Sequence, residues 1–487
     1  MPSQPKRARR DKAIDCPHLN NEPEKLTLLS LPDLPLLRVL SFLPMTDLAA
    51  AGTACCRLGA LARAHWTLWR GKELAPRVPG VPARGLWDLL RVAPRVDKLS
   101  CDDVNCDAYA RCFESYESER SAAIVSTLEV RTSENVLLAC LIREFTPRVK
   151  QLSYSGPDLN MLYFNLQYAT RIELLCIDCE GDSPELRGRP CWPQDVVLPR
   201  LHTVIFELNH DDIQSTLDAF GSLLQAHRGQ LRSVWLGGSE MLPLLDVLDA
   251  RPGNGNLQRL KLETGEGAAE RVRRFQPHLK ELIVHCDERI AEMARLFKSW
   301  SGPLERLELQ GATLRMLRVL GEGRLAGLRH LTLGDISSKA DLQRTLAGLP
   351  RLHSLTLHRC HGRKSLEMLC NMAPTTIPAL ELLIFKNFQE ERCSKIKEVC
   401  PRVAELVPAV KSLVGRAPRS LHCVLLPYCA GVDNYWPEQH ERYCTILYRH
   451  STVAEAECPL CAEAVSTIRS VNYLREIKVT TMTRIQV

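Results

Sequence analysis

The sequence predicts an α/β fold in which short strands and return segments repeat along most of the chain, preceded by a small helical module. The first observation is an apolar pattern that recurs between residues 96 and 385. It consists of an apolar residue, two arbitrary residues, a second apolar residue, one arbitrary residue and a third apolar residue. Its twelve starts are Val96, Val125, Val149, Ile172, Leu201, Leu231, Leu257, Leu279, Leu304, Leu328, Leu352 and Leu380. The second observation is a separate set of helix-spaced apolar residues before this pattern.

The spacing of the pattern predicts how the strands are arranged. Neighbouring starts lie 22 to 30 residues apart, and the last two apolar positions alternate with polar ones, as in a strand with one buried face. One strand and its return segment cannot bury that face alone, so neighbouring units must stack. The pattern resembles the leucine-rich repeat family. The resemblance implies a horseshoe-shaped solenoid of about 12–14 repeats over residues 96–430. An ordinary α/β domain with similar strands is the alternative.

Composition limits the classes of function. A chain of 487 residues exceeds one ordinary core, and its net charge of +6 does not favour a nucleic acid partner. The chain opens without an apolar leader and has no run of 18 apolar residues, so we expect no membrane association and a cytoplasmic or nuclear location. The twenty cysteines are then expected to be reduced thiols.

The first 25 residues are predicted to be a disordered basic tail, because they carry a Lys- and Arg-rich run and no periodic apolar positions. That run, residues 6–12, is either a nuclear localisation signal or a solvated tail.

Residues 26–71 are predicted to form three short helices. Leu36, Val39, Leu40 and Leu43 follow the i, i+3, i+4, i+7 spacing of one helical face, and Pro44 ends that helix. A second, Ala-rich helix is expected from Asp47 toward Leu61, and a third short segment carries Trp66 and Trp69. About 45 residues cannot supply a stable independent core, so we expect part of the apolar surface to await a partner.

The order of these residues resembles the F-box family, whose motif binds a Skp-type adaptor that links a substrate receptor to a cullin–RING ubiquitin ligase. The resemblance implies that eight residues form or support the adaptor surface: Leu31, Pro32, Leu36, Val39, Leu40, Leu43, Leu48 and Trp69. Two positions depart from the family pattern. Leu34 stands where an acidic residue is usual, and Leu58 where a Trp is common. The alternative is a helical cap that shields the first repeat.

The remaining segments are a Pro- and Gly-rich connector at 72–95 and irregular C-terminal repeats or a cap at 431–487. The aromatic stretch 427–466 is either a cap or a binding loop. The best metal candidate is His440, Cys444, Cys458 and Cys461. The Cys-Pro step at Cys458 also occurs at Cys400, just before an apolar position, so we expect no metal.

No phosphate-binding loop, nucleophile elbow or zinc-protease motif occurs, so we expect no cofactor and no enzymatic activity in this chain. Period-two alternation instead assigns a candidate substrate-binding set to the concave face of the strands: Trp235, Arg259, Lys261, Glu281, His285, Arg306, Glu308, His330 and His358. This mixture of charges favours a protein partner. Trp235 is either a binding hot spot or covered by a neighbouring loop.

The sequence therefore predicts the substrate-recognition subunit of a Skp–cullin–F-box ubiquitin ligase, with an unidentified protein substrate. The alternative is a repeat scaffold or inhibitor whose helical module is only a cap.

Overall fold

The computed structural model describes most of the chain between residues 27 and 386. The described residues are 27–70, 72–74, 95–102, 124–131, 145, 148–156, 159–180, 197–209, 213–249, 256–285, 290–310, 314–322, 324–334, 339–358, 379–386, 423–427 and 444–448. The predicted basic tail, most of the connector and three of the four candidate metal ligands (His440, Cys458 and Cys461) lie outside them, and of Cys444 only the backbone is described.

The N-terminal helical module contains three α-helices between two short 3₁₀ turns. Its elements are η1 (Leu28–Ser30), α1 (Asp33–Ser41), α2 (Met45–Ala54), α3 (Cys56–Ala64) and η2 (Trp66–Leu68). Helix α1 begins directly after Pro32, and Asp33 places a negative charge in its first turn, where the helix dipole favours it.

The expected single helix from Asp47 toward Leu61 is wrong, because the chain forms two helices there. Cys55 adopts an extended conformation, with φ −154° and ψ 159°, that ends α2 and starts α3. Its sulfur accepts a hydrogen bond from the backbone N–H of Leu58 at 3.4 Å, which caps the new helix. The two helices then pack closely: a Cβ on Gly59 would lie 2.5 Å from the carbonyl oxygen of Gly52.

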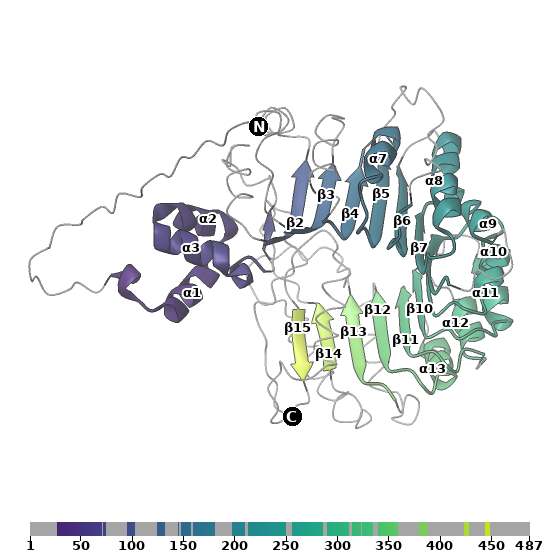
Figure 1. Ribbon diagram of the computed structural model, residues 1–487. Helices are drawn as coiled ribbons and strands as arrows, with labels where there is room; N and C mark the ends of the chain where they lie inside the picture. The colour runs from purple at the N-terminus through teal and green to yellow at the C-terminus, as the bar shows by residue number, and fades with distance from the viewer. Residues whose placement is uncertain are drawn as a thin grey trace, which may run out of the picture.

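All the described strands after the helical module belong to one continuous sheet (Figure 1). Its first strands are β1 (Glu73–Leu74), β2 (Arg95–Asp102), β3 (Ile124–Arg131), β4 (Gln151–Ser155), β5 (Leu174–Glu180), β6 (Thr203–Asn209) and β7 (Ser233–Gly237). It continues with β8 (Arg259–Glu263), β9 (Glu281–His285), β10 (Arg306–Gln310), β11 (His330–Gly334), β12 (Ser354–His358), β13 (Leu382–Lys386), β14 (Cys423–Pro427) and β15 (Cys444–Tyr448).

Strands β2 to β13 are the twelve strands that the sequence pattern predicts. They are hydrogen-bonded in chain order and all run parallel. This arrangement is compatible with the predicted solenoid. The strand direction changes only at the last described strand, because β15 pairs with β14 antiparallel. Strand β15 lies within residues 431–487, which were expected to form irregular repeats or a cap.

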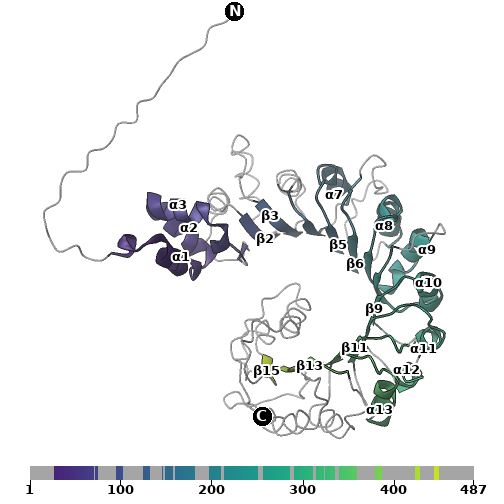
Figure 2. The ribbon, with the colours of Figure 1, turned by 60° about the horizontal axis from the view of Figure 1, so that its bottom comes forward.

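The helices cover the outer side of a curved sheet, and the strands line its inner side (Figure 2). These helices are α7 (Leu159–Leu166), α8 (Ile213–His227), α9 (Leu244–Asp249), α10 (Ala268–Phe275), α11 (Ile290–Lys298), α12 (Leu314–Leu320) and α13 (Lys339–Ala347), with the turn η4 (Ser239–Met241). Two of them, α8 and α11, contain residues 213–220 and 292–297, whose apolar spacing in the sequence predicts a helix.

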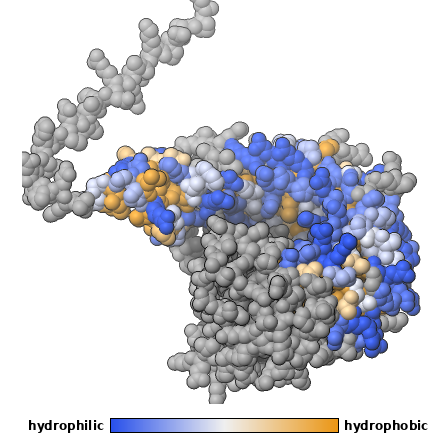
Figure 3. All heavy atoms as spheres, turned by 90° about the horizontal axis from the view of Figure 1, so that it is seen from below, coloured by the Kyte–Doolittle hydropathy of each residue, from blue (hydrophilic) through white to orange (hydrophobic). Residues whose placement is uncertain are grey.

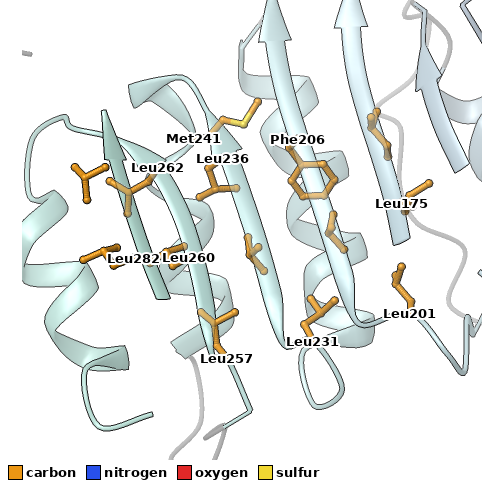
Figure 4. Close-up of a cluster of buried hydrophobic side chains, with 14 of the residues drawn as sticks. Leu175, Leu201, Phe206, Leu231, Leu236, Met241, Leu257, Leu260, Leu262 and Leu282 are labelled. Carbon is orange, nitrogen blue, oxygen red and sulfur yellow. The ribbon is translucent and has the colours of Figure 1, made fainter. Parts of the chain in front are cut away.

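The core lies between the strands and the helices, as a stack of aliphatic layers (Figure 4). Leu260 of β8 aligns with Leu282 of β9, and both are buried. Larger side chains join the layers locally: Phe206 of β6 stacks on Phe220 of α8, with ring centroids 3.9 Å apart. Side chains alternate along each strand, so one face is buried against the helices and the other lies on the inner side of the curved sheet. Within the part of the chain that is described, no helix is both long and apolar enough to cross a membrane.

Candidate functional site

The helical module exposes an apolar patch of five residues: Leu28, Leu29, Leu34, Val39 and Phe42. Leu34 and Phe42 are the most exposed, at 79% and 77%. Figure 3 shows hydrophobic residues gathered on this module, at the left of the view. Large exposed apolar groups concentrated on one small module are typical of a protein-binding surface.

Helix α1 separates this patch from the core of the module. A helix turns by about 100° per residue, which places Leu34, Val39 and Phe42 within an arc of roughly 140°. Leu36 and Leu40 fall outside that arc and are buried. The buried face therefore fixes which side of α1 the apolar patch presents.

Arg57 of α3 holds the start of the apolar patch in place. Its guanidinium donates hydrogen bonds to the backbone carbonyls of Leu29 and Leu31, the latter at 2.8 Å. It also lies 2.7 Å from the carboxylate of Asp33. One side chain thus fastens the segment before α1 to a helix more than twenty residues later.

The module is joined to the sheet by two contacts, and a third holds the segment before β1 against the module. Strand β1 pairs in parallel with β2, so the module's last residues add a strand to the sheet. Lys72 donates a hydrogen bond to the carbonyl of Leu43. Across the joint, the guanidinium of Arg95 in β2 lies 5.3 Å from the ring centroid of Trp66, a cation–π distance. These contacts set the direction in which the apolar patch faces relative to the sheet.

The inner face of the sheet carries three rows of side chains, one residue from each strand in each row. The amino-end row includes Arg259, Glu281, Arg306 and His330 of β8 to β11. The middle row includes Ile205, Trp235, Lys261, Ile283 and Glu308 of β6 to β10. The carboxyl-end row includes Asp178 and Glu207 of β5 and β6, then Glu263, His285 and Gln310 of β8 to β10.

The alternation that the sequence predicts for these strands is present. In β8 to β10, exposed or half-buried residues alternate with fully buried ones. The structure places eight of the nine predicted inner-face residues on these rows. For His358, only its backbone position at the end of β12 is described.

Neighbouring charges on the inner face contact one another. Glu281 lies 3.3 Å from Nε of Arg259 and 3.9 Å from Nε of Arg306, so one carboxylate serves two guanidinium groups. In the middle row, the ammonium of Lys261 lies 5.0 Å from the ring centroid of Trp235. The amide of Gln310 donates to Glu308 at 2.9 Å. These contacts hold neighbouring side chains of the inner face in fixed positions relative to one another.

Two titratable groups of the inner face have strongly shifted pKa values. Burial, together with the positive charges of Arg306, His353 and Arg329, lowers the pKa of His330 to about 4, so its ring is neutral at pH 7. Near β5, burial raises the pKa of the Cys176 thiol to about 12. The carboxylates of Glu207, Asp178 and Glu129 contribute to that increase. A thiol with this pKa is not a nucleophile at neutral pH.

Within the described ranges, no group of three or more His, Cys, Asp or Glu side chains is placed to hold a metal ion. The prediction of no metal at His440, Cys444, Cys458 and Cys461 stays a prediction, because three of these residues lie outside those ranges and only the backbone of Cys444 is described.

Comparison with known families adds one match, which covers the helical module. Residues 28–73 match the F-box-like family model. This chain contains an F-box-like domain. No curated protein matches the chain. F-box domains generally bind Skp-type adaptors, so the match points to the same surface as the exposed apolar residues.

The F-box-like domain divides the eight predicted adaptor residues into two groups. Leu36, Leu40, Leu48 and Trp69 are buried and build the core, where the indole N–H of Trp69 donates to the carbonyl of Ala62 at 2.8 Å. Pro32 and Val39 are exposed, and Leu31 and Leu43 are half-buried. The first group can only support an adaptor surface, while the second group can contact a partner.

Four exposed residues of the F-box-like domain were missed by sequence reasoning: Leu28, Leu29, Leu34 and Phe42. Leu34 was noted only as a departure from the family pattern. The one signal in the sequence is that Leu34 and Phe42 are large apolar residues outside the predicted stripe of Leu36, Val39, Leu40 and Leu43.

Proposed function

We propose that this protein is the substrate-recognition subunit of a Skp–cullin–F-box ubiquitin ligase. In this proposal, the F-box-like domain docks a Skp-type adaptor through the apolar patch. The adaptor connects the chain to a cullin–RING ligase, and the sheet, which we propose to be a leucine-rich-repeat solenoid, binds a protein substrate.

The observation that carries the proposal is the coincidence of the family match with the apolar patch. Residues 28–73 match the F-box-like model, and the five exposed apolar residues all fall within them. Leu34 and Phe42 alone place two large side chains in water. Burying one large apolar side chain contributes about 1.5–3 kcal/mol, so an adaptor that covers both gains substantial affinity.

The sheet supports the second half of the proposal. Its inner face presents mixed charges and the half-buried ring of Trp235 on closely spaced strands, a combination suited to protein recognition. The joint at β1 and β2 connects this face to the F-box-like domain. A receptor of this kind acts by proximity: it raises the effective concentration of a substrate lysine near a charged conjugating enzyme. The chain itself carries no reaction step, and we propose that it works in the cytoplasm or nucleus.

The proposal is tested by co-expressing the full chain with a Skp-type adaptor and a cullin, followed by size-exclusion chromatography. We expect the three proteins to co-elute, and a Leu34→Ala/Phe42→Ala variant to elute without the other two. If the folded wild-type chain elutes alone, the ligase role is wrong and the F-box-like domain serves only as a cap.

A further inference from the structure

The turns that lead into strands β5 to β9 carry a row of basic residues at the amino-end edge of the sheet. They are Arg171, Arg200, Arg228, Arg232 and Lys280. Arg228 is half-buried and the other four are exposed. Each of them precedes the first residue of its strand, so this row is separate from the three rows of the inner face. We call it the basic rim.

The backbone fixes the order of the basic rim. The N–H of Arg232 donates to the carbonyl of His202 at 2.8 Å, and the N–H of Gln258 donates to the carbonyl of Arg232 at 2.9 Å. The N–H of Lys280 continues this ladder, donating to the carbonyl of Gln258 at 2.8 Å. The turns that form the ladder lie at the lower ends of the strands in Figure 4. One turn therefore follows the next at the strand spacing of about 4.8 Å.

Side-chain hydrogen bonds hold neighbouring turns together. The amide of Gln230 donates to the carbonyl of Leu198 at 2.6 Å, which joins the turn before β7 to the turn before β6. The amide of Asn256 donates to the carbonyl of Gly229 at 2.5 Å, which joins the turn before β8 to the turn before β7. A ligand of the basic rim thus meets a backbone that is already ordered, so little entropy is lost there on binding.

The positive charge of the basic rim is not neutralised by its surroundings. In the described residues of these turns, the basic side chains meet one carboxylate, Glu173, which lies 3.1 Å from Lys150 in the turn before β4. Among the side chains that the structure describes, none of the basic rim forms an ion pair. The first residues of the strands do not change this balance, because Arg259 and Glu281 lie 3.3 Å apart and offset each other. The basic rim therefore attracts anionic groups.

The length of the basic rim defines the size of its ligand. From β5 to β9 there are four strand steps, which together span about 19 Å. An extended peptide rises by about 3.3 Å per residue, so about six residues cover that distance. Runs of acidic residues repel one another and stay extended in solution. Their carboxylates also match the planar fork of the arginine guanidinium, which binds a carboxylate through two parallel hydrogen bonds.

A nucleic acid fits the basic rim less well than an acidic peptide does. Single-stranded nucleic acids bind by stacking their bases on aromatic side chains beside the basic groups. In the described part of these turns, the one exposed Phe, Tyr or Trp side chain is Tyr168, at the β5 end. A duplex presents phosphates along two strands, whereas the basic rim offers a single row of cations.

We propose that the basic rim binds an extended acidic segment of a partner protein, about six residues long. The segment runs along the turns from β5 to β9, and its glutamate or aspartate carboxylates face Arg171, Arg200, Arg232 and Lys280. Because the basic rim belongs neither to the apolar patch nor to the inner face of the sheet, this inference goes beyond the proposed function and does not depend on it.

The test titrates labelled peptides with the purified full chain and follows their fluorescence anisotropy. The first peptide carries a run of about six glutamates, and the second carries glutamines at the same positions. A single-stranded oligothymidylate of similar charge is the nucleic acid probe. We expect the acidic peptide to bind about tenfold more tightly than the glutamine peptide. Its affinity should fall about tenfold when the salt concentration is raised from about 0.05 M to about 0.3 M.

A triple variant then assigns the binding to the basic rim. Arg200→Gln/Arg232→Gln/Lys280→Gln should weaken the acidic peptide about tenfold, to the level of the glutamine peptide. Thermal denaturation checks that the variant is folded. If it is less stable than the wild type, Arg200→Gln and Lys280→Gln alone replace it, and each should weaken the acidic peptide about threefold.

The matched control removes the same charge from exposed side chains of the outer helices α11 and α13. It is Arg295→Gln/Lys298→Gln/Arg344→Gln, and it should leave the affinity for the acidic peptide unchanged.

Equal affinity for the acidic and glutamine peptides, or an affinity for the acidic peptide that the triple variant leaves unchanged, would overturn the inference. An equal loss in the control variant would overturn it as well, because the net charge of the chain and not the basic rim would then attract the peptide. Tighter binding of the oligothymidylate than of the acidic peptide, lost in the triple variant, would assign the basic rim to nucleic acid instead.

Discussion

The guanidinium of Arg57 lies 2.7 Å from the carboxylate of Asp33 and ties α3 to the first turn of α1. The same guanidinium bonds to the carbonyls of Leu29 and Leu31, so it orders the segment that carries the first two residues of the apolar patch. Both side chains are substantially exposed, and an exposed ion pair contributes about 0–1 kcal/mol to stability. Arg57 therefore matters more for the position of the apolar patch than for folding.

We accordingly expect Arg57→Ala to weaken adaptor binding by about threefold to tenfold while the melting temperature changes little. Asp33→Asn is the matched control, because it removes the ion pair and keeps both carbonyl contacts. It should retain most of the affinity. Isothermal titration calorimetry measures both values, and equal losses for the two variants would contradict the positioning role.

Removal of the exposed apolar side chains should affect binding and not stability. Leu34→Ala and Phe42→Ala should each weaken adaptor binding about tenfold or more, because each side chain becomes buried only in the complex. Phe164→Ala is the control, since Phe164 is an exposed aromatic residue on α7, outside the F-box-like domain. Leu36→Ala should instead destabilise the fold by about 2–5 kcal/mol, because Leu36 is fully buried. Urea denaturation distinguishes the two outcomes, and unchanged adaptor affinity in Phe42→Ala would argue against the proposed surface.

The fold could be predicted from the sequence wherever the same pattern of buried residues recurs from one strand to the next. Each strand from β4 to β13 begins two residues after a pattern start, because the first apolar residue anchors the turn and the next two point into the core. The inner-face positions follow from the same alternation. The break at Cys55 could not be predicted, because an Ala-rich stretch without Pro favours a continuous helix. The faces of α1 were also ambiguous, since Leu34 and Phe42 are as apolar as Leu36.

Close backbone contact between the segments before β9 and β10 predicts a strong effect at one glycine. A Cβ on Gly302 would lie 1.8 Å from the carbonyl oxygen of Gln276, whereas a Cβ on Gly229 would have no neighbour within 4 Å. We expect Gly302→Ala to destabilise the chain by about 3 kcal/mol or more, and Gly229→Ala to have little effect. Thermal denaturation followed by circular dichroism checks this pair. Equal melting temperatures would show that the backbone at Gly302 is packed less closely than described.

We expect the chain to be less stable in acid, because two histidines have lowered pKa values in the folded state. The buried ring of His227 accepts a hydrogen bond at Nε2 from the N–H of Leu198, and its Nδ1 lies 3.0 Å from the carbonyl of Leu223. Burial lowers the pKa of His227, and the pKa of His330 is lowered to about 4. Because the unfolded side chains titrate near about 6.5, the folded state resists protonation. Stability should be complete above that pH and decrease as the pH falls toward about 4.

Chemical denaturation at pH 7.5 and pH 5 measures this decrease. His227→Gln removes one of the two titrating groups and should reduce the difference between the two pH values. An unchanged difference would mean that His227 does not contribute to the acid sensitivity.

We propose that the adaptor docks on the apolar patch and does not contact the inner face of the sheet. Hydrogen–deuterium exchange of the full chain, with and without a saturating Skp-type adaptor, tests this most directly. We expect slower exchange at residues 28–43 and unchanged exchange in strands β6 to β10. Protection of those strands, or no protection at residues 28–43, would contradict it.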